Sequence, residues 1–433
     1  MTTTGSAAAA APSRPATFRE VFAIPEWRAL FATFLLSTIG DELARVALTV
    51  LVYARTGSPL LSALAFAISY VPWVLGGPVL SALADRLPRH RVLIGTDAVR
   101  AAVVAVMVVP GLPLPVLLVL LFLVSLGAPP FEAARQALQA DVLEGDRYAV
   151  ASSVTNVCLQ LTSVVGFVLG GALVALTSAR AALAFDAVTF ALSAVWLAVR
   201  LQRRPAPAAD PEGPTSLWQD TVAGLRFIAG NTRPRAIIGV LWVGSMFAYA
   251  PEGLAVPFAA SLGGGTTAVG VLLAANPLGV TLGGLLVTRL VPPDRRERLV
   301  APLLVTSLVL LATAGVLGHV LAPGHGAFAV VVALMFVSGL TSCWFIPLQA
   351  LFMAVVPPAF RGRAFGVAIS GLFAVQGLGV LAAGALADPL TPAGVVAGAG
   401  LAGLVAVAPV LLALLRTRPS VAPDRPAAGA SVA

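Results

Sequence analysis

The residues best suited to chemistry are three charged side chains inside an apolar stretch of the chain. Asp41, Glu42 and Arg45 lie within residues 27–53, where most other side chains are apolar. On a helix, Arg45 follows the two acids by four and three positions, so all three share one face. Burial disfavours the charged form of an acid that must share its cation with another acid. Asp41 or Glu42 is therefore a candidate proton carrier, and the alternative is a static triad that joins this helix to a neighbour.

A further acid, Glu252, lies in an apolar stretch of the second half of the sequence. Shifting the sequence by 207 residues superimposes Arg45 on Glu252 and Arg28 on Arg235. This register predicts that Arg45 and Glu252 approach a shared cavity, because charges at bilayer depth normally face water or a partner. Asp186, near the start of another apolar run, is expected to be structural.

Polar and aromatic side chains in other apolar stretches are candidates to line such a cavity. An apolar lining with few fixed polar groups suits an amphiphilic or hydrophobic cargo. Each of these side chains could instead bond to or pack against a neighbouring helix. The candidates are Asn156, Gln160, Trp242, Tyr249, Asn276, Gln349 and Gln376.

The residue types that most catalytic and metal centres need are scarce. All 27 basic residues are arginines, and the chain has three histidines and two cysteines. Without lysine it has neither a P-loop ATPase signature nor a Schiff-base residue. Two cysteines and three scattered histidines do not make a zinc or iron–sulfur site. We therefore expect no catalytic residue, no metal and no cofactor, and we infer that the chain is not an enzyme.

The composition indicates that most of the 433 residues lie in lipid. Hydrophobic residues make up 58% and charged residues 11%, whereas about 25% charged residues is usual for soluble domains. A membrane-spanning helix needs about 20 apolar residues. Twelve runs of that kind predict twelve transmembrane helices: 27–53, 60–84, 92–110, 113–135, 149–176, 181–200, 234–260, 266–289, 299–321, 326–353, 363–387 and 392–415.

The arginines predict the orientation of these helices. With both termini in the cytoplasm, all but four of the arginines fall in or beside cytoplasmic segments, which is the usual orienting signal. The net charge of +8 follows this topology, so we expect no nucleic-acid partner. We expect a multi-pass protein of the cell inner membrane. Its segments would be a cytoplasmic N-tail 1–26, a six-helix bundle 27–201, a cytoplasmic linker 202–233, a second six-helix bundle 234–415 and a cytoplasmic C-tail 416–433.

The linker contains a possible helix after Ser216. Its apolar residues Leu217, Trp218, Val222, Leu225 and Ile228 gather on one side. This pattern is typical of a helix that lies on the inner membrane face. A linker helix packed on the bundle is the alternative.

Several motifs in the chain resemble those of the major facilitator superfamily. The loop after the second span reads Ser81-Ala-Leu-Ala-Asp85-Arg86-Leu-Pro88-Arg89-His90-Arg91, and its Asp85, Arg86 and Arg89 match the family signature for that loop. Other stretches resemble one branch, the enterobactin-exporter and macrolide-efflux group. These are Gly40-Asp-Glu-Leu-Ala-Arg-Val-Ala-Leu, Thr56-Gly-Ser-Pro, Asp97-Ala-Val-Arg100-Ala, Ala134-Arg135-Gln-Ala-Leu, Gly224-Leu-Arg226-Phe, Pro347-Leu-Gln349-Ala and Arg361-Gly-Arg363.

The resemblance implies an all-α fold of two six-helix bundles with a gate at the cytoplasmic side. There the Asp85 carboxylate would accept hydrogen bonds from the free N–H groups at the start of span 11, near Arg361 and Arg363. Arg86 and Arg89 would pair with acids at the end of span 4, such as Asp141 or Glu144, and Asp97 with Arg100 would extend the network. The alternative is a solvated charged loop that only orients the chain.

The sequence thus predicts a secondary active transporter that works by alternating access. Its most favoured function is proton-coupled efflux of a small amphiphilic molecule, such as a drug, a macrolide-like or a siderophore-like compound. The expected partners are this substrate, protons and membrane lipid, and the resemblance implies a monomer. The alternatives are an uptake symporter or facilitator of a small metabolite and, less favoured, a non-transporting membrane scaffold or sensor.

Overall fold

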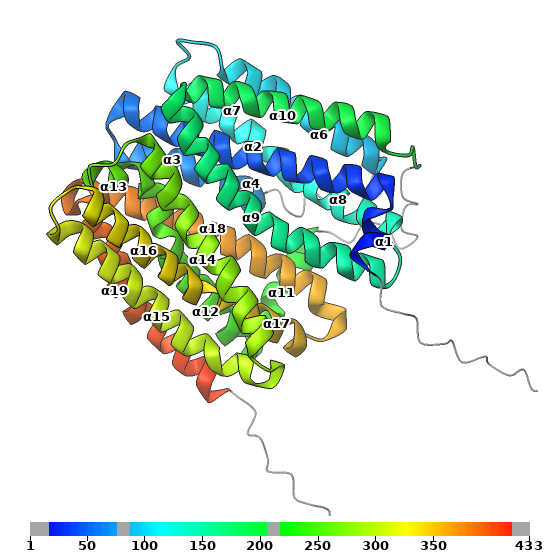
Figure 1. Cartoon of the computed structure of the whole chain (residues 1–433). Coiled ribbons are helices and arrows are strands. Elements are labelled where there is room, and N and C mark those ends of the chain that lie inside the picture. Colours follow the sequence, from blue (N-terminus) through cyan, green and yellow to red (C-terminus); the bar gives the residue numbers. More distant parts are fainter. Residues whose placement is uncertain (1–16, 76–86, 206–216, 418–433) are drawn as a thin grey trace, which may run out of the picture.

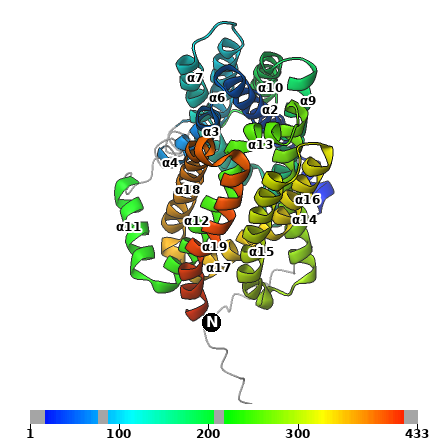
Figure 2. The same cartoon turned by 90° about the vertical axis from the view of Figure 1, so that its left-hand side faces the viewer.

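The computed structural model describes residues 17–75, 87–205 and 217–417 of the chain, and every regular element in them is a helix. Asp85 and Arg86 of the expected gate lie outside these residues. We call the described residues up to 205 the amino-terminal half and those from 217 the carboxy-terminal half. Figures 1 and 2 show the two halves side by side, with helices running between the same two ends of the molecule.

The amino-terminal half consists of ten helical elements. They are α1 (Phe18–Phe22), α2 (Pro25–Thr56), α3 (Pro59–Ala67), the 3₁₀ segment η1 (Ile68–Tyr70), α4 (Val71–Leu75), α6 (Arg89–Met107), α7 (Leu114–Leu126), α8 (Ala128–Val142), α9 (Asp146–Leu176) and α10 (Ala179–Arg200). Helix α2 begins with a proline, whose fixed φ suits the first helical position. It ends before Gly57, which has a φ of 63° and so provides the left-handed residue that closes many helices.

The carboxy-terminal half follows the linker. Its elements are α11 (Leu217–Gly230), α12 (Thr232–Tyr249), the 3₁₀ segment η2 (Ala250–Leu254), α13 (Ala255–Ser261), α14 (Thr266–Leu290), α15 (Pro293–Val320), α16 (His325–Ser342), α17 (Phe345–Val355), the 3₁₀ segment η3 (Pro358–Phe360), α18 (Arg361–Leu390) and α19 (Pro392–Arg416). The expected linker helix is α11. It packs on α18, where Gly224 lies against the carbonyl of Arg363.

Nine helical stretches of the described residues are long and apolar enough to cross a membrane. The predicted spans 27–53, 60–84 and 92–110 are not among them, for identifiable reasons. Charged residues interrupt α2 and α6, and α3 to α4 run toward residues that the structure does not describe. The charges that make α2 and α6 chemically interesting therefore also lower their hydropathy.

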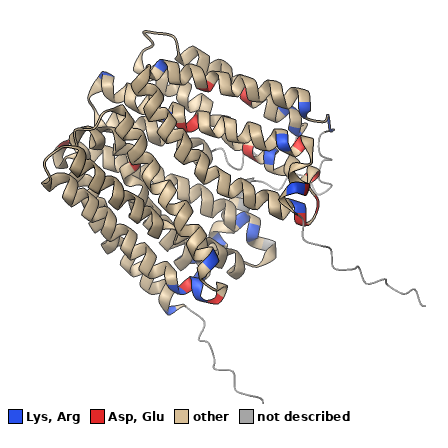
Figure 3. Ribbon diagram, in the orientation of Figure 1, with Lys and Arg blue, Asp and Glu red and all other residues tan. Residues whose placement is uncertain are grey.

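The two halves pack closely against each other at the end of the molecule opposite the termini. There α9 crosses α14 at Gly171 and Gly270, and α3 meets α18 at Gly384. A β-carbon on Gly270 would overlap the carbonyl oxygen of Phe167, so this crossing requires glycine. Small residues permit such close approach between membrane helices. Charged residues gather instead at the end that holds α1 and the last turn of α19 (Figure 3).

Candidate functional site

The charged residues of α2 contact two different neighbours. Both carboxylate oxygens of Asp41 accept hydrogen bonds from Arg100 Nη2 of α6, at 2.7 and 2.8 Å. Arg45 Nη1 lies 2.8 Å from Glu42 Oε2. Successive residues of a helix point about 100° apart, so Asp41 and Glu42 face different helices. The expected triad of Asp41, Glu42 and Arg45 is therefore not a single cluster: Arg45 pairs with Glu42, while Asp41 pairs with an arginine 59 positions away.

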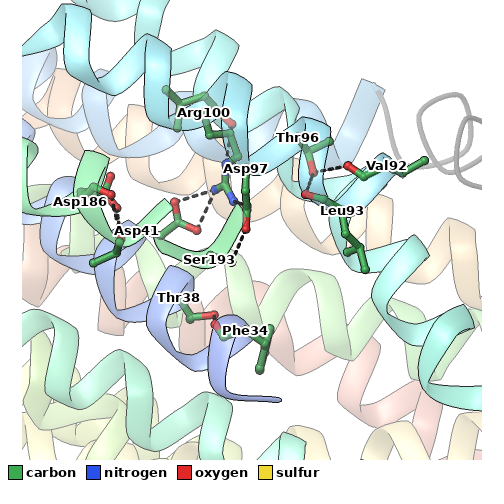
Figure 4. A network of polar contacts seen from close by, with 12 residues as sticks. Phe34, Thr38, Asp41, Val92, Leu93, Thr96, Asp97, Arg100, Asp186 and Ser193 are labelled. Atoms are coloured by element: carbon green, nitrogen blue, oxygen red, sulfur yellow. Dashed lines mark hydrogen bonds and ion pairs between the residues drawn. The ribbon is translucent and has the colours of Figure 1, made fainter. Parts of the chain in front are cut away.

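Arg100 is the centre of what we call the inner cluster, made of Asp41, Asp97, Arg100, Asp186 and Ser193 (Figure 4). Its side chain is 4% exposed, and its Nη1 lies 3.9 Å from Asp97 Oδ1. Its Nε donates to the carbonyl of Val124, and its guanidinium stacks 4.1 Å from the Phe190 ring centroid. Asp97 also accepts a hydrogen bond from the Ser193 hydroxyl of α10. Asp97 and Arg100 were expected to extend the gate loop, but they face Asp41 in the middle of the half because α6 packs on α10 beside α2.

Asp186 of α10 completes the inner cluster and is fully buried. Its Oδ1 accepts a hydrogen bond of 3.3 Å from the Thr189 hydroxyl, whereas its Oδ2 is buried without a hydrogen-bond partner among the described residues. A β-carbon on Gly40 would overlap both Asp186 and Thr189. The glycine thus lets the backbone of α2 approach this carboxyl directly. The sequence offered one signal for Asp186, an acid within an apolar run, but no partner for it.

A small cavity of about 70 Å³ adjoins the inner cluster within the amino-terminal half. Asp41, Arg45, Arg100 and Asp186 line it together with apolar side chains of α2, α4, α6 and α7. One water molecule occupies about 30 Å³ of liquid volume. The cavity therefore has room for one or two water molecules beside the charges and is too small for a drug-sized molecule.

A second group of polar residues lies between the two halves, and we call it the seam cluster: Glu42, Arg45, Tyr70 and Glu252. The hydroxyl of Tyr70, in η1, donates a hydrogen bond of 3.1 Å to Glu252 Oε2, in η2. Arg45 is close enough to Glu252 for their opposite charges to attract, and it lies 5.2 Å from the Phe66 ring centroid. The Ser163 hydroxyl of α9 donates to Glu42 at 3.3 Å. The structure thus brings Arg45 and Glu252 to one place, and it adds Tyr70.

Aromatic rings continue the seam cluster toward α18. The Tyr70 and Phe373 rings lie 5.8 Å apart, and Trp73 stacks on Phe373 at 5.2 Å. Ser370 of α18 also donates a hydrogen bond of 3.4 Å to the carbonyl of Trp73. These contacts join the second predicted span to the eleventh near the middle of both.

At the end that holds the termini, Arg89 forms an ion pair with Asp141 of α8 and donates a hydrogen bond of 3.2 Å to the Ala137 carbonyl. Asp141 is one of the two acids that the sequence offered it. At the start of α18, Arg361 Nε donates to the carbonyl of Val356 at 3.2 Å. The carbonyl of Arg363 lies against Gly224 of α11.

Sequence reasoning missed the surroundings of Arg135, which it used only as an orienting charge and a motif residue. Arg135 is 5% exposed and pairs with Glu132 at 2.6 Å. It also lies 4.2 Å from the Phe34 ring centroid, and it donates to Gln139, which in turn donates to Ser152 of α9. Its spacing from Glu132, three positions along a helix, was the available signal.

The seven candidate cavity residues are not brought together in one place. Gln376 is buried and Asn156 is exposed, whereas the others are half-buried. Trp242 Nε1 donates a hydrogen bond of 3.0 Å to the Ala368 carbonyl, and its ring covers Gly371. None of the seven lines the small cavity. The half-buried residues are Gln160, Trp242, Tyr249, Asn276 and Gln349.

In the described part of the chain, no three side chains among His, Cys, Asp and Glu form a group that could hold a metal ion. Cys158 is half-buried and Cys343 is buried, and both are free thiols. The chemistry available at the two clusters is therefore that of carboxylates, guanidinium groups and hydroxyls. Such groups bind and release protons and exchange hydrogen-bond partners.

Comparisons with known proteins agree with a transporter fold. The sequence profile of the Major Facilitator Superfamily matches residues 30–317. Macrolide efflux protein A of Streptococcus pyogenes is 21% identical over 375 residues, which cover 84% of this chain and 90% of that protein. An uncharacterized MFS-type transporter of Bacillus subtilis, YfiS, is 27% identical over 385 residues, which cover 83% and 86%.

Solved transporter structures share the fold. A POT family transporter in complex with a thioalcohol-conjugated peptide has a TM-score of 0.69 and 11% identity, and the match covers 90% of this chain and 96% of that one. A bacterial homolog of the human lysosomal transporter Spinster, in an inward-facing and unoccupied conformation, has a TM-score of 0.64 and 15% identity, with coverage of 93% and 96%. At these identities the likeness concerns the fold alone.

Proposed function

This chain belongs to the Major Facilitator Superfamily, and we propose that it exports a small amphiphilic molecule in exchange for protons by alternating access. It is a multi-pass membrane protein, and its family and fold are those of transporters rather than enzymes. We place it in the cell inner membrane with both termini in the cytoplasm. The twelve proposed crossings are the nine apolar stretches together with α2, α3 to α4, and α6.

The observation that carries the proposal is the seam cluster. Glu42, Arg45 and Glu252 bring charges to a buried place between the halves, where they are expensive unless they serve function. Alternating access requires contacts between the halves that can be exchanged, and a single hydrogen bond from Tyr70 to Glu252 is such a contact. The buried acids of the seam cluster and of the inner cluster are the groups from which the proton carrier can come.

The close glycine contacts between the halves indicate which state this structure represents. Gly171, Gly270 and Gly384 lie at the end opposite the termini. With cytoplasmic termini, that end is the outer one, so we assign this structure to a state that is closed at the outer end. The arginines gathered at the other end agree with a cytoplasmic face (Figure 3).

The proposed substrate class follows from the lining of the seam. The rings of Tyr70, Trp73 and Phe373 pack against one another in a row beside the charged groups, and this row is the proposed contact for the substrate when the seam opens. Aromatic faces with a few polar groups suit an amphiphilic molecule better than a sugar or an inorganic ion. The relative named macrolide efflux protein A makes macrolides a reasonable first probe.

Transport by membrane vesicles with an imposed pH gradient tests the proposal. Inside-out vesicles with an acidic lumen should accumulate a labelled macrolide, and a protonophore should abolish the accumulation. Glu252→Gln should lower it strongly, whereas Asp388→Asn, an exposed acid near the end of α18, should behave as wild type. Accumulation only in right-side-out vesicles with an acidic exterior would favour the uptake symporter instead. Movement of no probe from a broad panel in either direction would contradict transport altogether.

A further inference from the structure

The inner cluster lies away from the seam, yet its charge composition demands an explanation. Three carboxyl groups, Asp41 of α2, Asp97 of α6 and Asp186 of α10, surround the single guanidinium of Arg100. The other arginine beside the cavity, Arg45, is paired with Glu42. If all three acids were ionised, the cluster would carry two uncompensated negative charges in the membrane interior. Isolated buried charges are so unfavourable that such groups neutralise instead.

The hydrogen bonds distinguish the three acids from one another. Asp41 binds Arg100 Nη2 through both of its oxygens and is 32% exposed. Asp97 is also fully buried, and its Oδ1 has no hydrogen-bond partner among the described residues, but that oxygen lies 3.9 Å from the guanidinium and its Oδ2 accepts from Ser193. Asp186 has no ion pair within the described residues. It is fully buried, and its Oδ2 has no hydrogen-bond partner beside the small cavity.

We propose that the coupling proton of this transporter binds to the Asp186 carboxyl, in the cavity between α2, α6 and α10, and not to a residue of the seam. This inference rests on the proposed proton-coupled function. The charged groups that face Asp186 are Asp41 from α2 and Asp97 and Arg100 from α6. Arg45 of α2 also lines the cavity and is paired with Glu42. The remaining elements, η1, α4, α7 and α8, contribute only uncharged residues to the lining: Ser69, Trp73, Leu121, Val124, Ser125 and Ala128.

The cavity gives the proton a path and the carboxyl a partner. A water molecule within it could accept the hydrogen bond that protonated Asp186 Oδ2 lacks, because the volume exceeds that of one water. Asp41 lines the same cavity and is partly exposed. Asp41 and Asp186 thus share one cavity, and a water molecule in it could pass a proton between them.

The geometry also couples the proton to the seam. When Asp186 loses its proton, the new negative charge attracts Arg100 away from Asp41, because all three lie in one low-dielectric cluster. Asp41 then needs a new partner. Gly40 places the backbone of α2 directly against Asp186, and the next residues on α2, Glu42 and Arg45, belong to the seam cluster. A change in the charge of Asp186 therefore acts on the helix that carries the seam charges.

Purified full-length protein in liposomes tests the inference. Counterflow of the labelled macrolide at equal pH measures alternation, and accumulation driven by a gradient of about one pH unit measures coupling. One proton per substrate allows about tenfold accumulation for each pH unit. For Asp186→Asn, the ratio of accumulation to counterflow should fall about tenfold relative to wild type and to Asp388→Asn. Wild-type accumulation by Asp186→Asn would place the proton elsewhere.

Two further measurements keep the inference testable if Asp186→Asn does not fold. Thr189→Val removes the hydroxyl that donates to Asp186 Oδ1 and should shift the pH midpoint of transport upward, because the carboxylate loses a donor. In wild-type protein, infrared difference spectra should show loss of a protonated-carboxyl band when the macrolide binds. The same change on macrolide binding should occur in Glu252→Gln. If wild type shows no such change, or if the change seen in wild type disappears in Glu252→Gln, the assignment to Asp186 is wrong. Wild-type protein that shows counterflow but no pH-driven accumulation would instead refute the proposed proton coupling itself.

Discussion

Tyr70 and Glu252 come from opposite halves of the chain, 182 positions apart, and the Tyr70 hydroxyl donates a hydrogen bond of 3.1 Å to Glu252 Oε2. The bond closes the seam beside a charged pair, Glu42 and Arg45, that belongs to the amino-terminal half. A transporter that alternates must break such a bond in every cycle. A stronger bond would therefore raise the population of the outward-closed state relative to the alternative state.

Replacing Tyr70 by Phe should shift that balance away from the outward-closed state. The ring contacts with Phe373 remain, and only the hydrogen bond is lost. A hydrogen bond to a charged partner contributes about 1.5–3 kcal/mol, so the ratio of the alternative state to the outward-closed state should rise about tenfold to hundredfold. Distances between spin labels on Ala54→Cys and Leu390→Cys, at the outer end, would measure the shift. Tyr148→Phe, at an exposed tyrosine of α9, is the control, and identical distance distributions in all three proteins would refute the prediction.

Arg100→Gln should destabilise the protein strongly at neutral pH. The substitution removes the guanidinium that pairs with Asp41 and Asp97 and attracts Asp186. Breaking a buried ion pair by removing one partner costs about 3–5 kcal/mol. The loss should shrink as pH falls, because protonated acids no longer need the cation. Thermal unfolding in detergent between neutral and acidic pH measures both effects, and a destabilisation that is independent of pH would argue that packing on Phe190 is the main role of Arg100.

Gly270→Ala should impair closure of the outer end. A β-carbon there overlaps the carbonyl oxygen of Phe167, and overpacking typically costs about 1–3 kcal/mol. We expect lower transport and greater labelling of a cysteine at Leu60 by a membrane-impermeant reagent. Gly398→Ala on α19 is the matched control, because its β-carbon meets nothing within 4 Å. Equal transport by both variants would show that the crossing is not part of the cycle.

The ion pair of Arg89 with Asp141 should contribute little to stability. Asp141 is 39% exposed and Arg89 is 22% exposed, and exposed pairs typically contribute about 0.2–1 kcal/mol. A double-mutant cycle with Arg89→Ala and Asp141→Ala, measured by thermal unfolding, should give a coupling energy in this range that decreases as salt is added. A coupling that salt does not weaken would point to a desolvated pair.

The sequence predicted the class of this molecule and the positions of its unusual charges, but not their partners. Five charged residues stand out in the sequence because charged residues are rare in apolar runs: Asp41, Glu42, Arg45, Arg100 and Glu252. Which neighbour each one meets depends on the rotation of α2 against α6 and α9, and helical spacing along one chain does not encode that rotation. Asp97 and Arg100 are close in sequence and were correctly expected to face each other, although Arg100 binds Asp41 more closely.

Asp186 also shows that the sequence does not identify the partners of a buried charge. A single acid with no basic residue three or four positions away offers no pair to recognise, so it was expected to be structural. Its surroundings come from Gly40 and Arg100 on other helices. Likewise, Tyr70 is an ordinary aromatic residue in the sequence, and only the packing of α3 against η2 brings its hydroxyl to Glu252.

Both partners of the bond across the seam belong to 3₁₀ segments, Tyr70 to η1 and Glu252 to η2, and each segment interrupts a longer helical stretch. A 3₁₀ turn has 3.0 residues rather than 3.6, so rewinding one such segment to α-helical form turns each successive side chain by about 20°. A local rewinding of η1 or η2 would swing the hydroxyl and the carboxylate apart while the long helices stay where they are. The hydrogen bond between Tyr70 and Glu252 can therefore break through a change within one helix, before either half begins to tilt.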